Sequence, residues 1–276
     1  MTSDRVAANI SMLFGELPFL ERPRAAAEAG FAAVEFWWPF SRPIPHQLET
    51  RELAEAIRGA GVRVALMNLD VGPEAGSNGM VSIARHRDQF VANLEAALPV
   101  IEQLRVPVVS VPFGNVDPLS TVPAQRAVAI EGLALAVDAA ATVGATVVVE
   151  ALNNVANPNV VLSRTSEVAG LLDELRVTTG RRAKVQFDAY HAAMMGEDPL
   201  AELVSILPSL GHVQLADHPG RHEPGSGSLD WKALLRLLTE SGYDGTVGFE
   251  YEPAADTWAG LSWLDDMASL SGGQER

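Results

Sequence analysis

Short runs of apolar and β-branched residues alternate with longer helix-like segments along the whole chain. Eight such runs have the composition of buried strands: Ala8–Leu13, Ala33–Trp37, Arg63–Leu69, Pro107–Pro112, Ala145–Glu150, Ala183–Asp188, Gly211–Leu215 and Thr246–Tyr251. The clearest helical segments between them are Arg24–Ala29, Leu48–Ala60, Phe90–Leu104 and Ala124–Thr142. Strands that alternate with helices predict a parallel sheet.

The junctions between these segments support the same interpretation. Four glycines end a helical segment just before a strand, where a left-handed backbone often caps a helix: Gly30, Gly61, Gly144 and Gly242. Helix starts are expected at Ser120, Thr165 and Asp230. Eight strand–helix units favour closure into a barrel. An open doubly wound sheet is the alternative, but no Gly-x-Gly-x-x-Gly motif follows the first strand.

Length and composition fit a barrel of the α/β class. The chain has 276 residues, 47% of them hydrophobic, and no cysteine. No linker-like or low-complexity stretch divides it, so we expect residues 1–276 to form a single (β/α)8 TIM-barrel domain. The first residues lack the apolar core of a signal peptide, and no apolar run approaches the roughly 20 residues of a membrane span. These features predict a cytoplasmic protein with no membrane partner.

The strong negative charge narrows the classes of partner. A formal net charge of -15 repels phosphate backbones and acidic membrane faces. We therefore expect no nucleic-acid partner. A small anionic substrate remains compatible, because a metal ion and a few cations can reverse the field inside one pocket.

Alternation along the last four predicted strands separates polar from apolar side chains. Residues two apart in a strand share a face. One face is apolar and should pack against the outer helices: Val147, Val149, Phe187, Val213, Leu215, Val247 and Phe249. The other face should point into the barrel, and it ends in Glu150, Asp188, Gln214 and Glu250.

Three carboxylates and one carboxamide thus end four successive strands. A lone acid at a strand end is more often a helix cap or a salt-bridge partner, but four in register favour a metal site. Buried like charges need a compensating cation, and oxygen ligands suit Mg²⁺ or Mn²⁺, with Co²⁺ as a third candidate. Glu35 is interpreted as structural, paired with a buried Lys or Arg. His212 is expected to be a buried core residue rather than a ligand.

At these positions the sequence resembles the hydroxypyruvate isomerase family, within the xylose-isomerase-like TIM barrels that also include ketose 3-epimerases. The matching segments extend from the first strand to the last: Ser11–Phe14, Pro18–Glu21, Ala33–Phe36, Val149–Asn153, Gln186–His191, Gly211–Gly227 and Gly248–Pro253. The part from His212 to Gly227 is the most specific.

The resemblance implies roles for individual residues. Glu150, Asp188, Gln214 and Glu250 match the ligands of one divalent metal ion, and the two glutamates also match the paired acid/base carboxylates. Two further positions match contacts to substrate oxygens: His191 and Arg221. Additional candidates for substrate contact are Phe14, Asn68 and His222.

Such a site suits the movement of a carbonyl group to a neighbouring hydroxylated carbon. A metal ion stabilises the enediolate, and two carboxylates remove and return protons. Arg221 can pair with a substrate carboxylate, and His191 can donate a hydrogen bond to the developing oxyanion. We therefore predict an aldose–ketose-type isomerase, an intramolecular oxidoreductase, acting on a short hydroxy-keto acid. The specific prediction is hydroxypyruvate to tartronate semialdehyde.

Two long loops depart from the family pattern and leave alternatives open. Asp70–Arg85 and Ala216–Leu229 follow strand ends, where a TIM barrel builds its site. Because such loops line the substrate, a ketose 3-epimerase or an isomerase of 2-oxo-tetronates or sugars is the nearest alternative. Alternatives of other classes are an endonuclease IV-like nuclease and a non-catalytic sugar-binding barrel. Trp258 and Trp263 suggest buried surface between subunits of a homo-oligomer.

Overall fold

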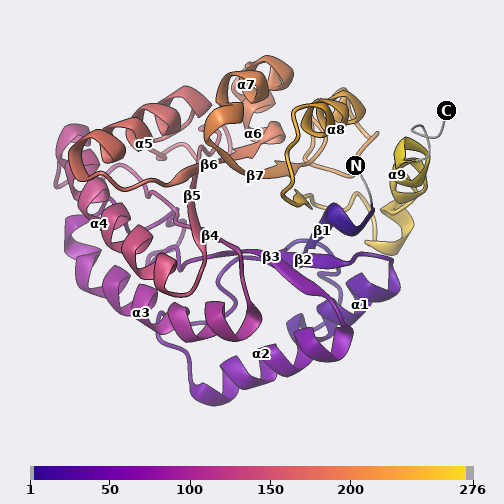
Figure 1. The fold of residues 1–276 in the computed structure, drawn as a ribbon, viewed down its shortest axis with the longest axis horizontal. Helices are drawn as coiled ribbons and strands as arrows, with labels where there is room; N and C mark the ends of the chain where they lie inside the picture. Colours follow the sequence, from indigo (N-terminus) through magenta and orange to yellow (C-terminus); the bar gives the residue numbers. More distant parts are fainter. Residues whose placement is uncertain (1–2, 272–276) are drawn as a thin grey trace.

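The computed structural model describes residues 3–271 and contains one closed barrel of parallel strands in the order β1 to β8 (Figure 1). The strands are β1 (Val6–Asn9), β2 (Ala33–Phe36), β3 (Arg63–Asn68), β4 (Val108–Ser110), β5 (Thr146–Glu150), β6 (Lys184–Asp188), β7 (Leu210–Leu215) and β8 (Val247–Phe249). β8 pairs with β1, with Val6 opposite Val247. The predicted barrel is confirmed, and closure excludes the open sheet.

Helices form a ring outside the strands (Figure 1). They are α1 (Arg22–Glu28), α2 (Gln47–Ala60), α3 (Arg87–Leu104), α4 (Val122–Thr142), α5 (Thr165–Thr179), α6 (Ala189–Met194), α7 (Pro199–Ile206), α8 (Trp231–Glu240) and α9 (Trp263–Ser271). Short 3₁₀ turns lie at Ser3–Arg5, Phe19–Glu21, Ala84–His86, Leu207–Ser209 and Trp258–Gly260. Across residues 3–271, none of the helices combines the length and apolar character that a membrane crossing requires.

The main apolar core lies between the barrel and the helices. All the apolar strand residues that were predicted to face outward are buried in this core, which confirms the assignment of faces. Inside the barrel, Ala7, Ala33 and Ala65 form a separate small cluster. Ala7 and Ala33 precede Asn9 and Glu35 on the same faces of β1 and β2, so the barrel interior changes from alanine to polar side chains toward the C-terminal strand ends.

The first strand differs most from its predicted bounds. It was expected at Ala8–Leu13, but β1 ends at Asn9. The backbone N–H groups of Met12 and Leu13 both donate to the Asn9 carbonyl, at 3.1 and 2.8 Å, so the chain turns there. Ile10, Leu13 and Phe14 after Asn9 are buried in this turn, and burial gives a turn the same composition as a strand.

Helix ends agree more closely with the prediction. The predicted capping glycines all have a positive φ, between 72° and 95°. Asp230 caps α8 through a hydrogen bond from the Ala233 N–H, at 2.9 Å. Thr121 rather than Ser120 caps α4, and Thr165 is the first residue of α5 rather than its cap.

The two C-terminal tryptophans occupy different environments. Trp263 is buried within its own chain, where it stacks on Phe249 with ring centroids 4.0 Å apart. Trp258 is 45% exposed and packs edge-on against Phe14. Trp263 therefore offers no surface to another subunit, and a homo-oligomer stays a prediction.

Candidate active site

A cavity of about 340 Å³ opens at the C-terminal ends of the strands. Glu150, His191, Arg221 and Glu250 line the part next to β5–β8. The remaining wall comes from strand ends and loops that follow β2 to β5: Trp37, Trp38, Asn68, Asp70, Val71, Ser77, Asn78, Ser110, Pro112, Phe113, Gly114, Leu152, Asn157, Val160 and Leu162. Both long loops that were noted in the sequence thus contribute to one cavity.

The four predicted metal-binding residues lie next to one another at the ends of β5 to β8. Register places Asp188 opposite Gln214. The side chains of Glu150 and Glu250 are 11% and 4% exposed. Glu150 Oε1 and Asp188 Oδ2 are buried without a hydrogen-bond partner. These two buried oxygen atoms lie close together, and neither accepts a hydrogen bond. A cation that contacts both of them would be the missing partner.

Asp188 uses its two carboxylate oxygens differently. Its Oδ1 accepts hydrogen bonds from the N–H groups of Tyr190, at 2.7 Å, and His191, at 3.4 Å, at the start of α6. These bonds fix the side chain and leave Oδ2 as the oxygen without a partner. The same residue therefore orients the polypeptide after β6 and offers one oxygen to a metal ion.

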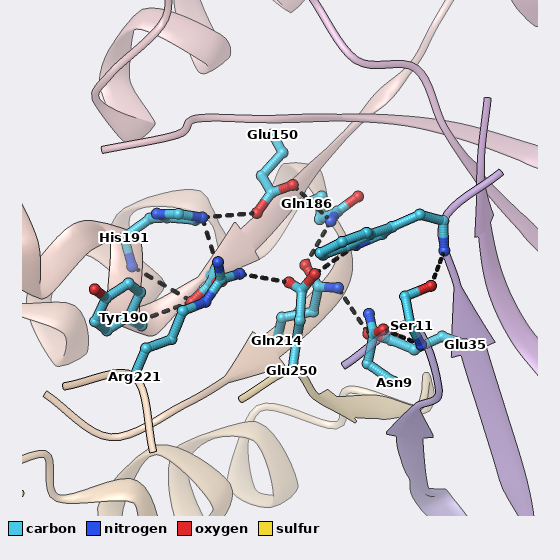
Figure 2. Close-up of polar contacts among 12 residues, drawn as sticks. Asn9, Ser11, Glu35, Glu150, Gln186, Tyr190, His191, Gln214, Arg221 and Glu250 are labelled. Carbon is cyan, nitrogen blue, oxygen red and sulfur yellow. Dashed lines mark hydrogen bonds and ion pairs between the residues drawn. The ribbon is translucent and has the colours of Figure 1, made fainter. Parts of the chain in front are cut away.

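Gln214 is held from two sides. Its Nε2 donates to Glu35 Oε1 at 2.7 Å, and its Oε1 accepts from Gln186 Nε2 at 2.5 Å. Gln186 Nε2 also donates to Glu150 Oε2 at 3.0 Å. Figure 2 shows Gln186 between Glu150 and Gln214. The Gln214 oxygen therefore lies on the side of the carboxylates.

Ionisation of these carboxyl groups is costly in the absence of a cation. Burial raises the pKa of Glu150 well above its usual value, and the nearby Glu250 and Asp188 raise it further. Burial also raises the pKa of Asp188 to about 6 and that of Glu250 to about 8, although the Arg221 guanidinium opposes both shifts. A divalent ion would remove this cost, so the residues present fit the predicted metal site.

His191 presents a defined hydrogen to the site. The Asn153 backbone N–H donates to His191 Nδ1 at 3.2 Å, so in the neutral ring the proton is on Nε2. Burial and the nearby Arg221 lower the pKa of His191 well below its usual value, which keeps the ring neutral. Nε2 lies 3.7 Å from both Glu150 Oε1 and Asp188 Oδ2.

Glu150, Asp188 and His191 are close enough together to hold a metal ion. The Nε2–H of His191, however, points toward the two carboxylates and carries no lone pair for a metal. This tautomer instead favours the role of hydrogen-bond donor that was predicted for His191.

Arg221 brings a positive charge into the cavity from the loop after β7. Its Nη2 lies 3.3 Å from Glu250 Oε2, and its guanidinium lies 5.4 Å from the Tyr190 ring centroid. The residue has a positive φ of 59°, and its Nε is buried without a partner. Asp217 organises the loop by accepting backbone N–H bonds, including those of Gly225 at 2.7 Å and Leu229 at 2.9 Å.

Three residues with contacts to the site were not among the predicted site residues. Trp37 Nε1 donates to Glu250 Oε1 at 2.6 Å, Gln186 bridges two of the expected ligands, and Asn153 sets the tautomer of His191. Gln186 was detectable, because a carboxamide in mid-strand on an inward face needs a buried partner. The positions of Trp37 and Asn153 depend on loop paths that periodicity does not define.

The other predicted contact residues are more dispersed. Asn68 lines the cavity, and its Oδ1 is buried without a partner. Phe14 is fully buried beside Trp258, and the Nδ1 of His222 lies 2.7 Å from the Glu252 carbonyl oxygen. Neither Phe14 nor His222 lines the cavity wall, and their contacts to substrate stay predictions.

Glu35 corrects one expectation. The predicted Lys or Arg partner is wrong, because its Oε2 lies 2.7 Å from His212 Nε2 and its Oε1 accepts from Asn9 Nδ2 at 3.1 Å. Both Glu35 and His212 are buried inside the barrel. The prediction that His212 is a hydrogen-bonded core residue is confirmed.

Known proteins resemble this chain over most of its length. The family model described as Xylose isomerase-like TIM barrel matches residues 23–267. A Streptomyces coelicolor protein, provisionally named a hydroxypyruvate isomerase, is 41% identical over 94% of this chain and 95% of its own. The 2-oxo-tetronate isomerase of Cupriavidus necator is 34% identical over 94% of this chain and 97% of its own.

A solved structure agrees in both fold and sequence. The Brucella melitensis protein named AP endonuclease, family 2, has a TM-score of 0.86 and 34% identity, with coverage of 95% of this chain and 98% of its own. The names of the two curated relatives support the prediction of an isomerase. The chain belongs to the xylose isomerase-like TIM barrel family, within its group of hydroxypyruvate isomerases and related enzymes.

Proposed function

We propose that this isomerase depends on a divalent metal ion and interconverts hydroxypyruvate and tartronate semialdehyde. The observation that carries the proposal is the pair Glu150 and Glu250 on the wall of one cavity, where Glu150 Oε1 and the neighbouring Asp188 Oδ2 are buried without hydrogen-bond partners. The same cavity contains a cation, Arg221, and a hydrogen-bond donor, His191. Together these groups suit the binding and isomerisation of a small hydroxy-keto acid.

Four residues would hold the metal: Glu150, Asp188, Gln214 and Glu250. All offer oxygen, which suits Mg²⁺ or Mn²⁺, with Co²⁺ as a third candidate. When bound, a divalent ion stabilises negative charge that develops on the carbonyl and hydroxyl oxygens of the substrate.

The protein groups account for the proton movements. One proton leaves C3 of hydroxypyruvate and one arrives at C2, while a hydroxyl proton moves from O3 to O2. Glu150 and Glu250 are the groups that take and return the carbon-bound protons, because burial raises the pKa of Glu150 well above its usual value and that of Glu250 to about 8. The Nε2–H of His191 donates to the developing oxyanion. Arg221 pairs with the substrate carboxylate.

Solvent exchange tests the proposal directly. Hydroxypyruvate is incubated in D₂O with Mg²⁺ or Mn²⁺, and deuterium at C3 is followed by NMR together with formation of tartronate semialdehyde. We expect exchange and turnover that both disappear when the metal is chelated. If neither occurs at high enzyme concentration, hydroxypyruvate is not the substrate, although the reaction class remains open to other substrates.

The size of the cavity favours a second candidate substrate. Its volume of about 340 Å³ falls in the range of roughly 300–1,000 Å³ of pockets that enclose much larger ligands than a three-carbon acid. Asn68, Asp70 and Asn78 provide hydroxyl-binding groups on the cavity wall. A 2-oxo-tetronate has one hydroxylated carbon more than hydroxypyruvate and would use this space. Comparison of kcat/KM for hydroxypyruvate, 2-oxo-tetronates, tagatose and ribulose decides between the candidates.

A nuclease function, which the name of the Brucella melitensis protein suggests, has less support in this chain. The net charge is -15, and Arg221 is the one permanently charged cation among the described residues that line the cavity. A phosphodiester backbone needs several cations along its path. We expect no binding of DNA that contains an abasic site in a mobility-shift assay at physiological salt.

A further inference from the structure

A buried polar layer lies directly beneath the metal-binding residues. At its centre is Glu35 of β2, which is 0% exposed and reaches across the barrel interior to β7. Its carboxylate contacts Gln214, His212 and Asn9, at 2.7, 2.7 and 3.1 Å. Figure 2 shows Asn9 and Glu35 on the side of Gln214 away from His191 and Arg221. None of these contacts reaches the cavity, so the layer has a role other than substrate binding.

The barrel provides the space for Glu35 by means of a glycine. Gly248 lies on β8, two residues before the ligand Glu250 and opposite Gln214. A Cβ at position 248 would lie 2.1 Å from Glu35 Oε2 and 2.3 Å from Oε1. Every other residue type would therefore displace the carboxylate from its position across the barrel.

The chemistry of the contact determines how Gln214 is oriented. A carboxamide has an oxygen at one end and an NH₂ group at the other, and the two ends have similar size. A carboxylate only accepts hydrogen bonds, so Glu35 must receive the NH₂ end of Gln214. The oxygen is consequently directed to the other side, where it accepts a hydrogen bond from Gln186 Nε2 at 2.5 Å and where Glu150 and Asp188 leave two oxygens without partners.

We infer that Glu35 is a positioning residue for the metal site, because it selects the orientation of Gln214 in which the oxygen faces the ion. It contacts neither substrate nor metal and acts through Gln214. Gln186 does not select this orientation by itself, because its own amide has an oxygen without a partner and can turn to accept from Gln214. Without Glu35, the NH₂ group of Gln214 can therefore face the site and repel a cation. The inference rests on the proposed metal site but is independent of which substrate is isomerised.

The variant Glu35→Gln tests this role with little change in shape. Glutamine presents either an oxygen or an NH₂ group to Gln214, so it no longer selects one orientation. We expect the Kd for Mn²⁺, measured by isothermal titration calorimetry on metal-free protein, to rise by roughly 10–100-fold, as is usual when a partner of a metal ligand is lost. An unchanged Kd overturns the inference.

A double-mutant cycle separates positioning from a general structural effect. Gln214→Met removes the ligand oxygen while keeping a similar length. If Glu35 acts through Gln214, adding Glu35→Gln to this background leaves the Kd for Mn²⁺ unchanged. If the second substitution weakens binding by the same factor as in the wild type, Glu35 acts elsewhere and the inference is wrong.

A matched control is the buried carboxylate Asp117, which pairs with Arg85 at 2.6 Å outside the site. Asp117→Asn is expected to lower Tm and to leave the Kd for Mn²⁺ unchanged. If Glu35→Gln does not fold, the double variant Glu35→Gln with Gln214→Glu is measured in its place. It exchanges the two side chains, so one carboxylate and one carboxamide still meet. Mn²⁺ binding within about tenfold of wild type then supports the inference, and weaker binding contradicts it.

The outcomes also distinguish this inference from the proposed function. If the wild type binds no divalent metal, both fail. If the wild type binds Mn²⁺ and Glu35→Gln binds it equally well, only the positioning role fails. If the Kd shifts as expected and hydroxypyruvate is not turned over, only the proposed substrate fails.

Discussion

The two halves of the barrel mouth are built on different principles. Along β5 to β8, one polar side chain lies near each C-terminal strand end. Only Asp188 and Gln214 are directly opposite each other, whereas Glu150 is opposite Gln186 and Glu250 lies two residues beyond Gly248, the partner of Gln214, so the expectation that all four are in register is wrong. Along β2 to β4, the cavity wall consists mostly of loop residues, such as Asp70, Asn78 and Phe113. The first half has the groups that we propose to move protons and to hold a cation, whereas loops of the second half form most of the remaining cavity wall. Under the proposed function, reaction type and substrate identity therefore depend on separate parts of one cavity.

The largest effect is expected from a change in the β5–β8 half. Glu150→Gln should lower kcat by about 10²–10⁴-fold, because it removes one of the two proton-transfer groups. Steady-state kinetics with the best substrate measures the loss, and Mn²⁺ titration shows how much of it reflects metal binding. Glu252→Gln, an exposed glutamate near the same strand end, is the control and should be unaffected. Equal activity of Glu150→Gln and wild type would contradict the proton-transfer role of Glu150.

The second expected effect is a pH-dependent loss of stability in the metal-free protein. The pKa of Asp188 is raised to about 6 and that of Glu250 to about 8, so the folded state holds protons that the unfolded state releases near pH 4. This contribution to stability is complete below that pH and is lost as pH rises through 6 and 8.

Calorimetry of the metal-free protein should therefore show Tm falling between pH 5 and pH 8, by on the order of 5 °C. Saturating Mg²⁺ should restore Tm most at pH 8. Glu250→Gln removes one titrating group and should flatten the pH dependence. A Tm that rises over this range, or a variant with the same slope as wild type, would argue against buried protonated carboxyl groups.

The smallest effect is expected from the β2–β4 half, and it should depend on the substrate. Asn68→Leu removes the buried Oδ1 that lacks a partner on the cavity wall. We expect kcat/KM for a 2-oxo-tetronate to fall by roughly 3–10-fold more than kcat/KM for hydroxypyruvate, which corresponds to one hydrogen bond. The ratio of the two substrates is the internal control. Equal losses for both would place Asn68 near the reacting atoms and weaken the division between the two halves.

The same division explains what the sequence could reveal. Strand alternation and burial predicted which faces of β5 to β8 point inward, and the four strand-end residues followed directly from that count. The barrel was predictable for the same reason, since each strand and helix has its own local pattern.

Contacts between distant strands were not predictable in this way. Glu35 and His212 are 177 positions apart, and their contact depends on barrel closure and on register shifts at Val34/Glu35 and Val185/Gln186. Trp37 reaches Glu250 over 213 positions for similar reasons. Local periodicity contains no information about such shifts, so a Lys or Arg was wrongly expected beside Glu35.

The close approach of Gly248 and Glu35 also restricts how this lineage can change. A side chain gained first at position 248 meets the carboxylate at 2.1 Å, whereas a shortened residue 35 leaves His212 and Gln214 without their shared acceptor. Each single step is unfavourable, although the two changes together are compatible. The pair should therefore persist or disappear as a unit during evolution. A glutamate in β2 together with a glycine two residues before the last proposed ligand should identify relatives with the same buried polar layer.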